Sequence, residues 1–473
     1  MTLKLLNLLV GFSLMIFIFL VIITNLLGYR NPFLLSNRFS SIFSSKFHKH
    51  LRYKRPETTK HIPCADFFDP KYDRFYLASQ FRVSYTESTN EDEWSTDCGS
   101  IYERNHFYVE PLSAEEREFP LAYARNVFKD YRLTEMLLSA TWAPQNYYCF
   151  SVDGQATPLF RKRMHNLASC FPNVHITNVV LNMDSYGHNT SDHYVECFNW
   201  LTNKERHWKY VMIVQNFDIP LKTNQEMVQI LKWYNGTNDV STQKHDPWAN
   251  NTWTFEALGL FKDPNRNKLV VNWNKPTLGF TRSMVQTTVS RAAMDFITEK
   301  LNLTKLIKQY NSYPTSTVDE FLISSLNSND NIQLPGGFTQ KCYPQIGNVL
   351  AMTRFGIWWK DKPKCDSQIW RHGVCIFGLE DLRTKFTTNH FFIINKMIPE
   401  YDYSAIVCWN EVLFNRTFFD RGVHRLNKDA YVNLPQVRLN AARRRFGKKF
   451  DMEYHMCERF YNDTIGTVFS EWN

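Results

Sequence analysis

Short apolar runs alternate with amphipathic stretches along the chain from Phe119 onward. Residues 145–153 form a mostly apolar run that ends in a carboxylate, which is typical of a buried strand. Residues 159–170 follow with the spacing of an amphipathic helix, and residues 174–180 form a second apolar run. Strands and helices that alternate in this way predict an α/β domain with a central, mostly parallel sheet.

The same pattern continues in the next part of the chain. Residues 208–215 are predicted to form a third strand, which residues 216–220 interrupt, and residues 223–233 have the spacing of a helix. Residues 235–276 are polar and rich in turn-forming residues, and we expect a long loop that contacts substrate. A basic run at residues 443–449 is expected to form a solvated face.

The N-terminus carries a long apolar stretch. Residues 5–27 contain no charged side chain, and a helix of about 23 residues, at ~1.5 Å each, spans a bilayer core of ~30 Å. A cleaved signal peptide is the alternative, but the stretch is long for one and no small-residue cleavage site follows it. We therefore predict a cytosolic tail at residues 1–4 and a transmembrane signal-anchor helix at residues 5–27.

Most of the net charge lies in the N-terminal segment. The whole chain carries +9, and residues 1–63, with nine Lys or Arg and one acidic residue, account for +8 of it. The rest of the chain is nearly neutral, which argues against a nucleic-acid binder, because such a protein spreads basic residues over its folded surface. Residues 28–62 are Ser-rich, basic and aperiodic and are interpreted as a lumenal stem, with a membrane-surface helix around residues 43–53 as the alternative.

Cysteines and glycosylation sequons indicate the compartment. The chain has ten cysteines, an even number that suits an oxidising environment. It also has six Asn-x-Ser/Thr sequons, at Asn189, Asn235, Asn250, Asn302, Asn415 and Asn462. Positive charges follow the span and favour a cytosolic body, but that rule is the weaker one for a long C-terminal domain. We predict a lumenal body.

Several catalytic motifs are missing from the sequence. It contains no G-x-G-x-x-G, no Walker A loop, no H-E-x-x-H and no G-x-S-x-G, which argues against dinucleotide-binding, NTPase, zincin and α/β-hydrolase functions. No Asp-x-Asp occurs either. A lumenal α/β enzyme that uses a nucleotide sugar normally holds its divalent ion with that pair, so fixed cations would have to replace the ion.

A series of stretches, in order and across about residues 98–410, resembles one enzyme family. They include PQNYYCFSVD at residues 144–153, TVDEFL at residues 317–322 and RHGVCIFG at residues 371–378. Further stretches lie at residues 120–123, 168–171, 208–224, 354–358, 381–382 and 389–396. The series is similar to the core-2/I-branching β-1,6-N-acetylglucosaminyltransferase family, whose relatives include peptide O-xylosyltransferases.

The resemblance implies a type II Golgi membrane enzyme with a GT-A-like fold, which inverts the anomeric carbon and uses no divalent metal. It assigns a glycosyltransferase domain to residues 63–420. Residues 421–473 are then a C-terminal extension of unknown role.

The resemblance also assigns residues that contact the donor. Val127 and Asp153 are donor contacts, and Asp153 stands at the end of a predicted strand, where an α/β sheet receives a nucleotide. A turn or helix cap is the alternative role of Asp153. Lys396 and Arg371 are expected to neutralise the diphosphate leaving group, with solvated surface charges as the alternative. Some family members carry the base where His372 stands, so His372 is the alternative to Arg371.

Three residues are assigned to the acceptor side. Trp358 resembles a sugar-stacking tryptophan, and a core aromatic is an equal interpretation. Glu320 is predicted to be the general base, because an inverting displacement needs a carboxylate there and the family uses the glutamate of an Asp-Glu pair. The alternative is a capping box between Thr317 and Glu320 at the start of a helix. Asp319 is an acceptor-side contact and the competing base.

The family's cysteine pattern implies four disulfides, Cys98–Cys170, Cys149–Cys197, Cys365–Cys375 and Cys64–Cys408. Cys342 and Cys457 have no counterparts in that pattern, and their pairing with each other is one interpretation. Residues 240–253 depart from the family, because the acceptor-holding acidic and basic residues of the vertebrate branching enzymes do not align there. The departure concerns the acceptor and leaves the donor chemistry unchanged.

These expectations combine into one predicted function. The chain moves GlcNAc from UDP-GlcNAc to a hydroxyl of an O-linked glycan by β-1,6 branching, with no cofactor and no divalent metal. Its expected partners are the donor, a glycoprotein acceptor and the Golgi membrane, and not nucleic acid. Two alternatives stay open, a protein O-xylosyltransferase that uses UDP-xylose and a catalytically inactive, membrane-anchored glycan-binding protein.

Overall fold

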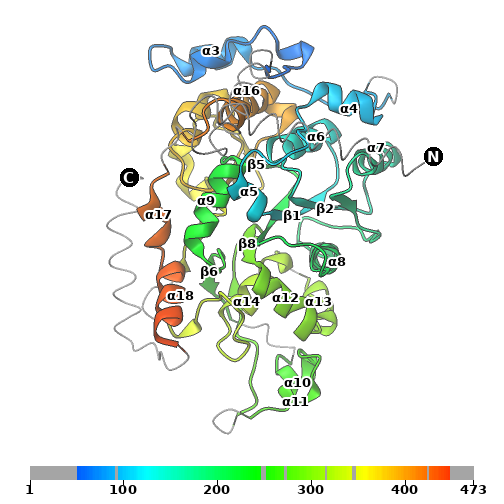
Figure 1. The fold of residues 1–473 in the computed structure, drawn as a ribbon, viewed down its shortest axis with the longest axis vertical. Helices are drawn as coiled ribbons and strands as arrows, with labels where there is room; N and C mark the ends of the chain where they lie inside the picture. The colour runs from blue at the N-terminus through cyan, green and yellow to red at the C-terminus, as the bar shows by residue number, and fades with distance from the viewer. Residues whose placement is uncertain are drawn as a thin grey trace, which may run out of the picture. The chain divides into compact units, whose positions relative to one another are not determined.

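A five-stranded sheet forms the centre of the fold, in the strand order β3-β2-β1-β4-β8 (Figure 1). The strands are β1 (Leu121–Val127), β2 (Tyr147–Val152), β3 (Val174–Ile176), β4 (Tyr210–Gln215) and β8 (Thr287–Ser290). β1 pairs in parallel with β2 and with β4, β2 pairs in parallel with β3, and β4 pairs antiparallel with β8. The mostly parallel sheet expected from the sequence is confirmed.

The structure is a computed structural model that describes residues 51–90, 94–246, 252–270, 274–314, 317–342, 348–422 and 426–447. From Lys54 onward these residues belong to one compact unit. In the described ranges, no helix is both long enough and apolar enough to cross a bilayer. The predicted anchor at residues 5–27 and most of the predicted stem at residues 28–62 lie outside them.

Three smaller β-structures stand beside the central sheet. A three-stranded sheet has the order β10-β13-β5, a second has the order β7-β6-β9, and β11 and β12 form a hairpin. Their bounds are β5 (Asp218–Pro220), β6 (Thr242–Lys244), β7 (Thr281–Arg282), β9 (Asn348–Val349), β10 (Arg354–Phe355), β11 (Trp370–Arg371), β12 (Val374–Cys375) and β13 (Ile393–Asn395).

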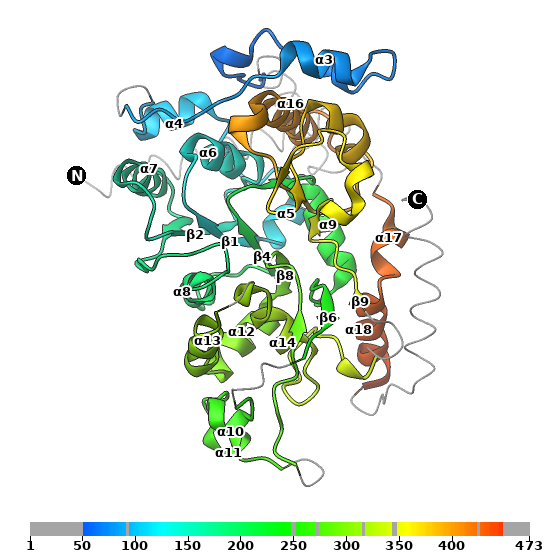
Figure 2. The same ribbon diagram turned by 180° about the vertical axis from the view of Figure 1, so that it is seen from behind.

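The helices connect and cover these sheets (Figures 1 and 2). The α-helices are α3 (Arg74–Phe81), α4 (Cys98–Arg104), α5 (Ala114–Glu118), α6 (Tyr131–Ala140), α7 (Pro158–Ser169), α8 (Thr190–Leu201), α9 (Asn224–Tyr234), α10 (Phe255–Leu258), α11 (Pro264–Asn267), α12 (Arg291–Lys300), α13 (Thr304–Asn311), α14 (Leu322–Ser328), α16 (Pro399–Phe418), α17 (Lys428–Val432) and α18 (Pro435–Phe446). Short 3₁₀-helices are η1 (Glu57–Thr59), η2 (Cys64–Phe67), η4 (Val318–Glu320), η5 (Gln340–Cys342), η6 (Trp359–Lys364) and η7 (Leu379–Asp381), and η8 (Leu382–Phe386) is a π-helix.

Helices cover both faces of the central sheet, because successive side chains of each strand point to opposite sides. Ala124 and Ile213 enter one core, which α8, α12 and α13 complete. Tyr123 and Met212 enter the other core, with side chains of α6, α7 and α9. Both ribbon views show α6 and α7 on one side of β1 and β2 and α8 on the other (Figures 1 and 2).

Local sequence signals explain the helix boundaries well. The helix expected at residues 223–233 is α9, where Thr223 and Glu226 form a capping box at the N-terminus. Val228 and Leu231 on its apolar face are completely buried. The helix ends at Asn235, which adopts the left-handed conformation that Asn tolerates.

Three expectations need correction. Residues 216–220 do not only interrupt a strand, because Asp218–Pro220 form β5 and pair with β13. The strand expected at residues 174–180 ends at Ile176. The loop expected at residues 235–276 contains β6, α10 and α11 in its described part, since short polar segments there still find backbone and core partners.

The structure contains the four disulfides that the resemblance implies, Cys64–Cys408, Cys98–Cys170, Cys149–Cys197 and Cys365–Cys375. Cys342 is also disulfide-bonded, and Cys457 lies outside the described residues. In the C-terminal extension, Tyr431, Leu434 and Val437 pack into the core that contains α9.

The predicted glycosylation sites differ in exposure. The side chains of Asn235, Asn302 and Asn415 are exposed. Asn189 is half-buried, and its Nδ2 donates a hydrogen bond to Asn182 O at 2.7 Å. Asn250 and Asn462 lie outside the described residues.

Candidate functional site

Asp218, Arg354 and Asn395 meet in the small sheet β10-β13-β5, each on a different strand. Asp218 is fully buried, and its carboxylate accepts hydrogen bonds from Asn395 Nδ2 at 2.7 Å and from Gln286 Nε2 at 3.0 and 3.1 Å. Arg354 donates from Nη2 to Asn395 Oδ1 at 2.6 Å and from Nη1 to Gln286 Oε1 at 3.0 Å. These bonds hold the Arg354 guanidinium in one orientation.

Arg371, His372 and Lys396 form a second group, which we call the basic cluster. Arg371 ends β11, and His372 with Gly373 forms the two-residue turn to β12, in which both residues have positive φ. Lys396 directly follows β13. Burial and the charges of Arg354 and Arg371 lower the pKa of Lys396 to about 8. Burial, Lys396 and Arg371 also lower the pKa of His372, so the three bases lie within electrostatic range of one another.

The charge of the buried Asp218 acts on Lys396 and raises its pKa, but no anionic side chain of the described residues forms an ion pair with the basic cluster. Within the described residues, the side chains of Arg371 and Lys396 make no hydrogen bond or ion pair, although both are half-buried. A half-buried cation without a partner is costly, and an anionic ligand would relieve that cost.

Val127 and Asp153 lie at the carboxyl ends of β1 and β2, where Asp153 N donates to Val127 O at 2.9 Å. Both side chains are buried. Asp153 Oδ1 accepts from Gln155 N at 2.8 Å and from Met183 N at 3.2 Å, so it caps a turn. Oδ2 accepts no hydrogen bond from the described residues, which leaves this oxygen available to a ligand.

An aromatic pair joins this strand edge to the basic cluster. Phe128 N donates to Asn216 Oδ1 at 2.9 Å, and the rings of Phe128 and Phe217 are 5.8 Å apart. The guanidinium carbon of Arg371 lies 5.8 Å from the centre of the Phe217 ring. The ends of the central strands and the basic cluster are therefore neighbours.

Asp319 and Glu320 lie on one turn, η4, which we call the carboxylate turn. The Glu320 carboxylate accepts a hydrogen bond from Arg282 Nε at 2.5 Å, and the Glu320 side chain is 13% exposed. Burial raises the pKa of Glu320, while the charges of Arg282 and Arg354 lower it. Burial and the charge of Glu320 raise the pKa of Asp319 to about 7.

The capping box considered for Glu320 does not form. Thr317 has a φ of +67°, and its side chain caps no backbone N–H of the turn. The Thr317 side chain instead helps to lower the pKa of Glu320, and α14 begins only at Leu322.

Arg354 lies within electrostatic range of both the carboxylate turn and the basic cluster. Its charge lowers the pKa of Glu320 and the pKa of Lys396. Its guanidinium carbon is 5.5 Å from the centre of the Trp358 ring. The structure thus brings Glu320, Trp358 and the basic cluster together around one arginine.

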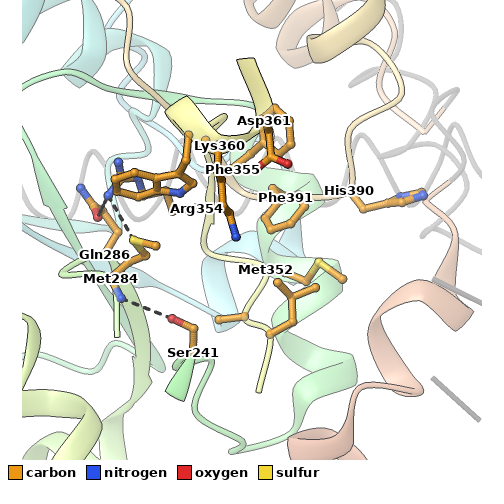
Figure 3. Close-up of a pocket in the computed structure, with 14 residues that line it drawn as sticks. Ser241, Met284, Gln286, Met352, Arg354, Phe355, Lys360, Asp361, His390 and Phe391 are labelled. Carbon is orange, nitrogen blue, oxygen red and sulfur yellow. Dashed lines mark hydrogen bonds between the residues drawn. The ribbon is translucent and has the colours of Figure 1, made fainter. Parts of the chain in front are cut away.

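Arg354 and Trp358 also line a pocket of about 430 Å³. Figure 3 shows Arg354, Gln286 and Met284 on one side of the pocket and Phe391 facing them. Trp358 is half-buried, so its ring both packs in the protein and reaches the pocket. The two interpretations of Trp358 are compatible.

Sequence reasoning does not single out several residues of this site. Asp218 and Arg354 stand in stretches that resemble the family, but nothing local marks them as charged partners of other strands. Arg282 stands in no such stretch, and its contact with Glu320 spans 38 positions of the chain. In the described part of the chain, no three or more His, Cys, Asp or Glu side chains are grouped to hold a metal ion.

Comparison with known proteins identifies the family. A family model described as core-2/I-branching enzyme matches residues 121–384, which are more than half of the chain. The matched region contains both strand ends, the carboxylate turn and two members of the basic cluster. The chain belongs to the core-2/I-branching enzyme family. It is therefore a glycosyltransferase, and the family implies a nucleotide-sugar donor and a glycan acceptor.

Individual members of the family are distant relatives of this core-2/I-branching enzyme. A human beta-1,3-galactosyl-O-glycosyl-glycoprotein beta-1,6-N-acetylglucosaminyltransferase is 28% identical over 331 residues, which cover 67% of this chain and 75% of the relative. The zebrafish (Danio rerio) form 4 is 28% identical over 391 residues, which cover 79% and 89%. The human form 3 is 27% identical over 334 residues, which cover 67% and 73%. The disulfides and this family together indicate the secretory pathway.

Proposed function

We propose that this core-2/I-branching enzyme transfers GlcNAc from UDP-GlcNAc to a hydroxyl of an O-linked glycan, with inversion, in β-1,6 linkage and without a divalent metal. One observation carries the proposal. Arg354 stands within electrostatic range of both Glu320 and Lys396, so a carboxylate and the cations of the basic cluster are grouped around one arginine. An inverting transfer needs these two kinds of group on opposite sides of the anomeric carbon.

In this mechanism Glu320 is the general base. The acceptor hydroxyl oxygen attacks C1 of GlcNAc, its proton passes to the Glu320 carboxylate, and the bond from C1 to the β-phosphate oxygen breaks. The bonding electrons leave with UDP, and the new bond forms on the opposite face of the sugar. Burial raises the pKa of Glu320, and the charges of Arg282 and Arg354 oppose this rise, which favours the ionised form that a proton acceptor requires.

The basic cluster would stabilise the leaving diphosphate. Arg371 and Lys396 are half-buried cations without described partners, and His372 at the hairpin turn adds a third donor. Fixed cations aimed at a developing negative charge stabilise the transition state without reorganisation. Val127 and Asp153 would hold the uridine, through contacts at the carboxyl ends of β1 and β2.

The acceptor would bind on the side of Trp358. The ring forms part of the 430 Å³ pocket and offers an apolar face to a sugar. The pKa of Asp319 is raised to about 7. Its carboxyl group, beside Glu320, would therefore either accept a hydrogen bond from the acceptor glycan or donate one to it. The names of the relatives favour GlcNAc over xylose as the transferred sugar.

Donor screening of the purified full-length chain tests the proposal. UDP release is measured with UDP-GlcNAc and with UDP-xylose, each with O-glycan acceptors and with serine-containing peptides, and product linkage is determined by NMR. We expect release that needs UDP-GlcNAc and a glycan, and a β-1,6 product. Transfer of xylose to serine, or glycan binding without turnover of any donor, would refute it.

We also propose the topology of a type II Golgi protein, with residues 1–4 cytosolic, residues 5–27 as the anchor, residues 28–62 as the stem and residues 63–420 as a GT-A-like catalytic domain. Residues 421–473 are the C-terminal extension. Exposed sequons at Asn235, Asn302 and Asn415 support a lumenal body. Cell-derived protein should sediment with membranes and lose mass on endoglycosidase treatment, and soluble or unglycosylated protein would contradict this topology.

A further inference from the structure

The segment at residues 181–188 connects the two ends of the candidate site. At its start, Gly154 N donates to Leu181 O at 2.8 Å. Met183 N donates to Asp153 Oδ1 at 3.2 Å, and Gln155 Nε2 donates to Met183 O at 2.9 Å. This end of the segment is therefore attached to the strand edge that carries Asp153.

The other end of the segment touches the carboxylate turn. Val318 N donates to Tyr186 O at 2.9 Å. Gly187 has a φ of +87°, and a Cβ atom at this position would lie 2.1 Å from Asp319 Oδ1. Only glycine allows the backbone to approach Asp319 so closely and to keep this conformation.

His188 stabilises the contact between the segment at residues 181–188 and the carboxylate turn through both of its ring nitrogens. Nδ1 is 2.6 Å from Asp184 Oδ2, and Nε2 is 2.7 Å from the carbonyl oxygen of Tyr313. A carboxylate and a carbonyl can only accept, so both nitrogens of His188 must donate, and the ring is the imidazolium cation. His188 thus ties Tyr313, which precedes the carboxylate turn in the chain, to the segment at residues 181–188.

We propose that His188 is a positioning residue, which holds the carboxylate turn against the segment at residues 181–188 and thereby orients Glu320. The proposal rests on the proposed role of Glu320 as the base. It assigns a function to a histidine that touches neither the basic cluster nor the pocket around Trp358.

The surroundings of His188 support the cation. Asp184 on its own segment and Asp319 on the carboxylate turn both raise the pKa of His188, together with the hydrogen bond to Tyr313 O. Glu320, which adjoins Asp319 on the carboxylate turn, is ion-paired with Arg282. When the pH rises through the raised pKa, His188 becomes neutral and must give up one of its two donated bonds.

The experiment compares His188→Ala with a matched control, His165→Ala, which replaces an exposed histidine of α7. Three quantities are measured on the full-length chain, namely kcat for transfer, the Kd of UDP and the amide hydrogen exchange of residues 313–322. We expect His188→Ala to lower kcat about 10- to 100-fold, as misplacement of a catalytic group does, with little change in the Kd of UDP. Exchange should become faster in residues 313–322 and stay unchanged in β1 and β2.

A second variant keeps the test independent of folding. Asp184→Asn retains the shape of the segment but removes the charge that raises the pKa of His188. The alkaline limb of the kcat profile should therefore move to lower pH, whereas kcat at pH values where His188 stays charged should change little. A purely structural role would lower kcat at every pH alike.

Several results would overturn the proposal. They are an unchanged kcat in His188→Ala, an equal loss of kcat in His165→Ala, or an alkaline limb that Asp184→Asn does not move. The exchange measurement separates this proposal from the proposed function. If Glu320→Gln stays active while His188→Ala still loosens residues 313–322, the assignment of the base is wrong and the positioning contact stands.

Discussion

The basic cluster and the carboxylate turn carry opposite charges in one site, and they are held by different means. Arg371 ends the paired strand β11 and Lys396 directly follows the paired strand β13, and the disulfide Cys365–Cys375 ties β12 of the Arg371 hairpin to Cys365. Glu320 stands on a single turn. That turn is held by an ion pair with Arg282 and by backbone contacts with Tyr186 and Ser283.

The comparison teaches which half of the site responds to its environment. Strand pairing and a disulfide do not titrate, so the side chains of the basic cluster keep their places over a wide range of pH, although Lys396, whose pKa is lowered to about 8, loses its charge at alkaline pH. Ion pairs weaken when one partner loses its charge, so the position and the pKa of Glu320 depend on its neighbours. We therefore expect substitutions at the basic cluster to change donor binding and substitutions around the carboxylate turn to change kcat and its pH dependence.

The largest effect is expected for Glu320→Gln. The amide keeps the shape of the side chain but cannot accept the acceptor proton, so kcat should fall about 10²- to 10⁴-fold, or ~3–5 kcal/mol of barrier. The Kd of UDP, measured by calorimetry, should stay the same. A kcat above about a tenth of the wild-type value would contradict the role of base and direct attention to Asp319.

Lys396→Ala should impair donor binding by the basic cluster. Loss of a charge-assisted contact of about 1.5–3 kcal/mol should weaken UDP binding roughly 10- to 100-fold and lower turnover with it. Lys308→Ala on α13 replaces an exposed lysine and serves as the control. If Lys396→Ala lowered kcat and left the Kd of UDP unchanged, the assignment of donor binding to the basic cluster would be wrong.

Arg282→Gln should change the pH dependence of kcat, which the carboxylate turn controls. Glu320 must be ionised to act as a base, and Arg282 opposes the effect of burial on its pKa. Removal of this charge should raise the pKa of Glu320 further and move the acid limb of the kcat profile to higher pH. An acid limb that stays in place would show that Arg282 does not control the ionisation of Glu320.

The smallest effect is expected for removal of divalent metal. If the basic cluster alone neutralises the leaving diphosphate, transfer activity should be the same in excess EDTA as without it. UDP release is measured with and without the chelator, and with manganese added back. Loss of activity in EDTA that manganese restores would show that the basic cluster alone does not neutralise the leaving diphosphate.

The sequence predicts much of the fold because its signals are local. The apolar runs that become β1, β2 and β4, and the capping box of α9, specify strands and a helix without help from distant residues. The very short strands β5, β10 and β13 were beyond such reasoning. Two or three residues carry no periodicity, and these strands form only because they pair with one another.

In the candidate site, too, some residues could be identified from local sequence and others only from the tertiary structure. Glu320, Lys396 and Arg371 could be named from motifs, because each stands in a stretch that resembles the family. Arg282 and His188 could not, since their partners lie 38 and 125 positions away in the chain. No rule of spacing connects such pairs.

The sequence by itself determined the class of the fold, the family and the residue types that carry charge. The tertiary structure alone decided which charges face each other. Arg354 comes within electrostatic range of Lys396 because β10 pairs with β13, and Glu320 forms an ion pair because β7 brings Arg282 to the carboxylate turn. Electrostatic interactions depend on distance in space and on burial, and neither quantity is contained in a local pattern of residues.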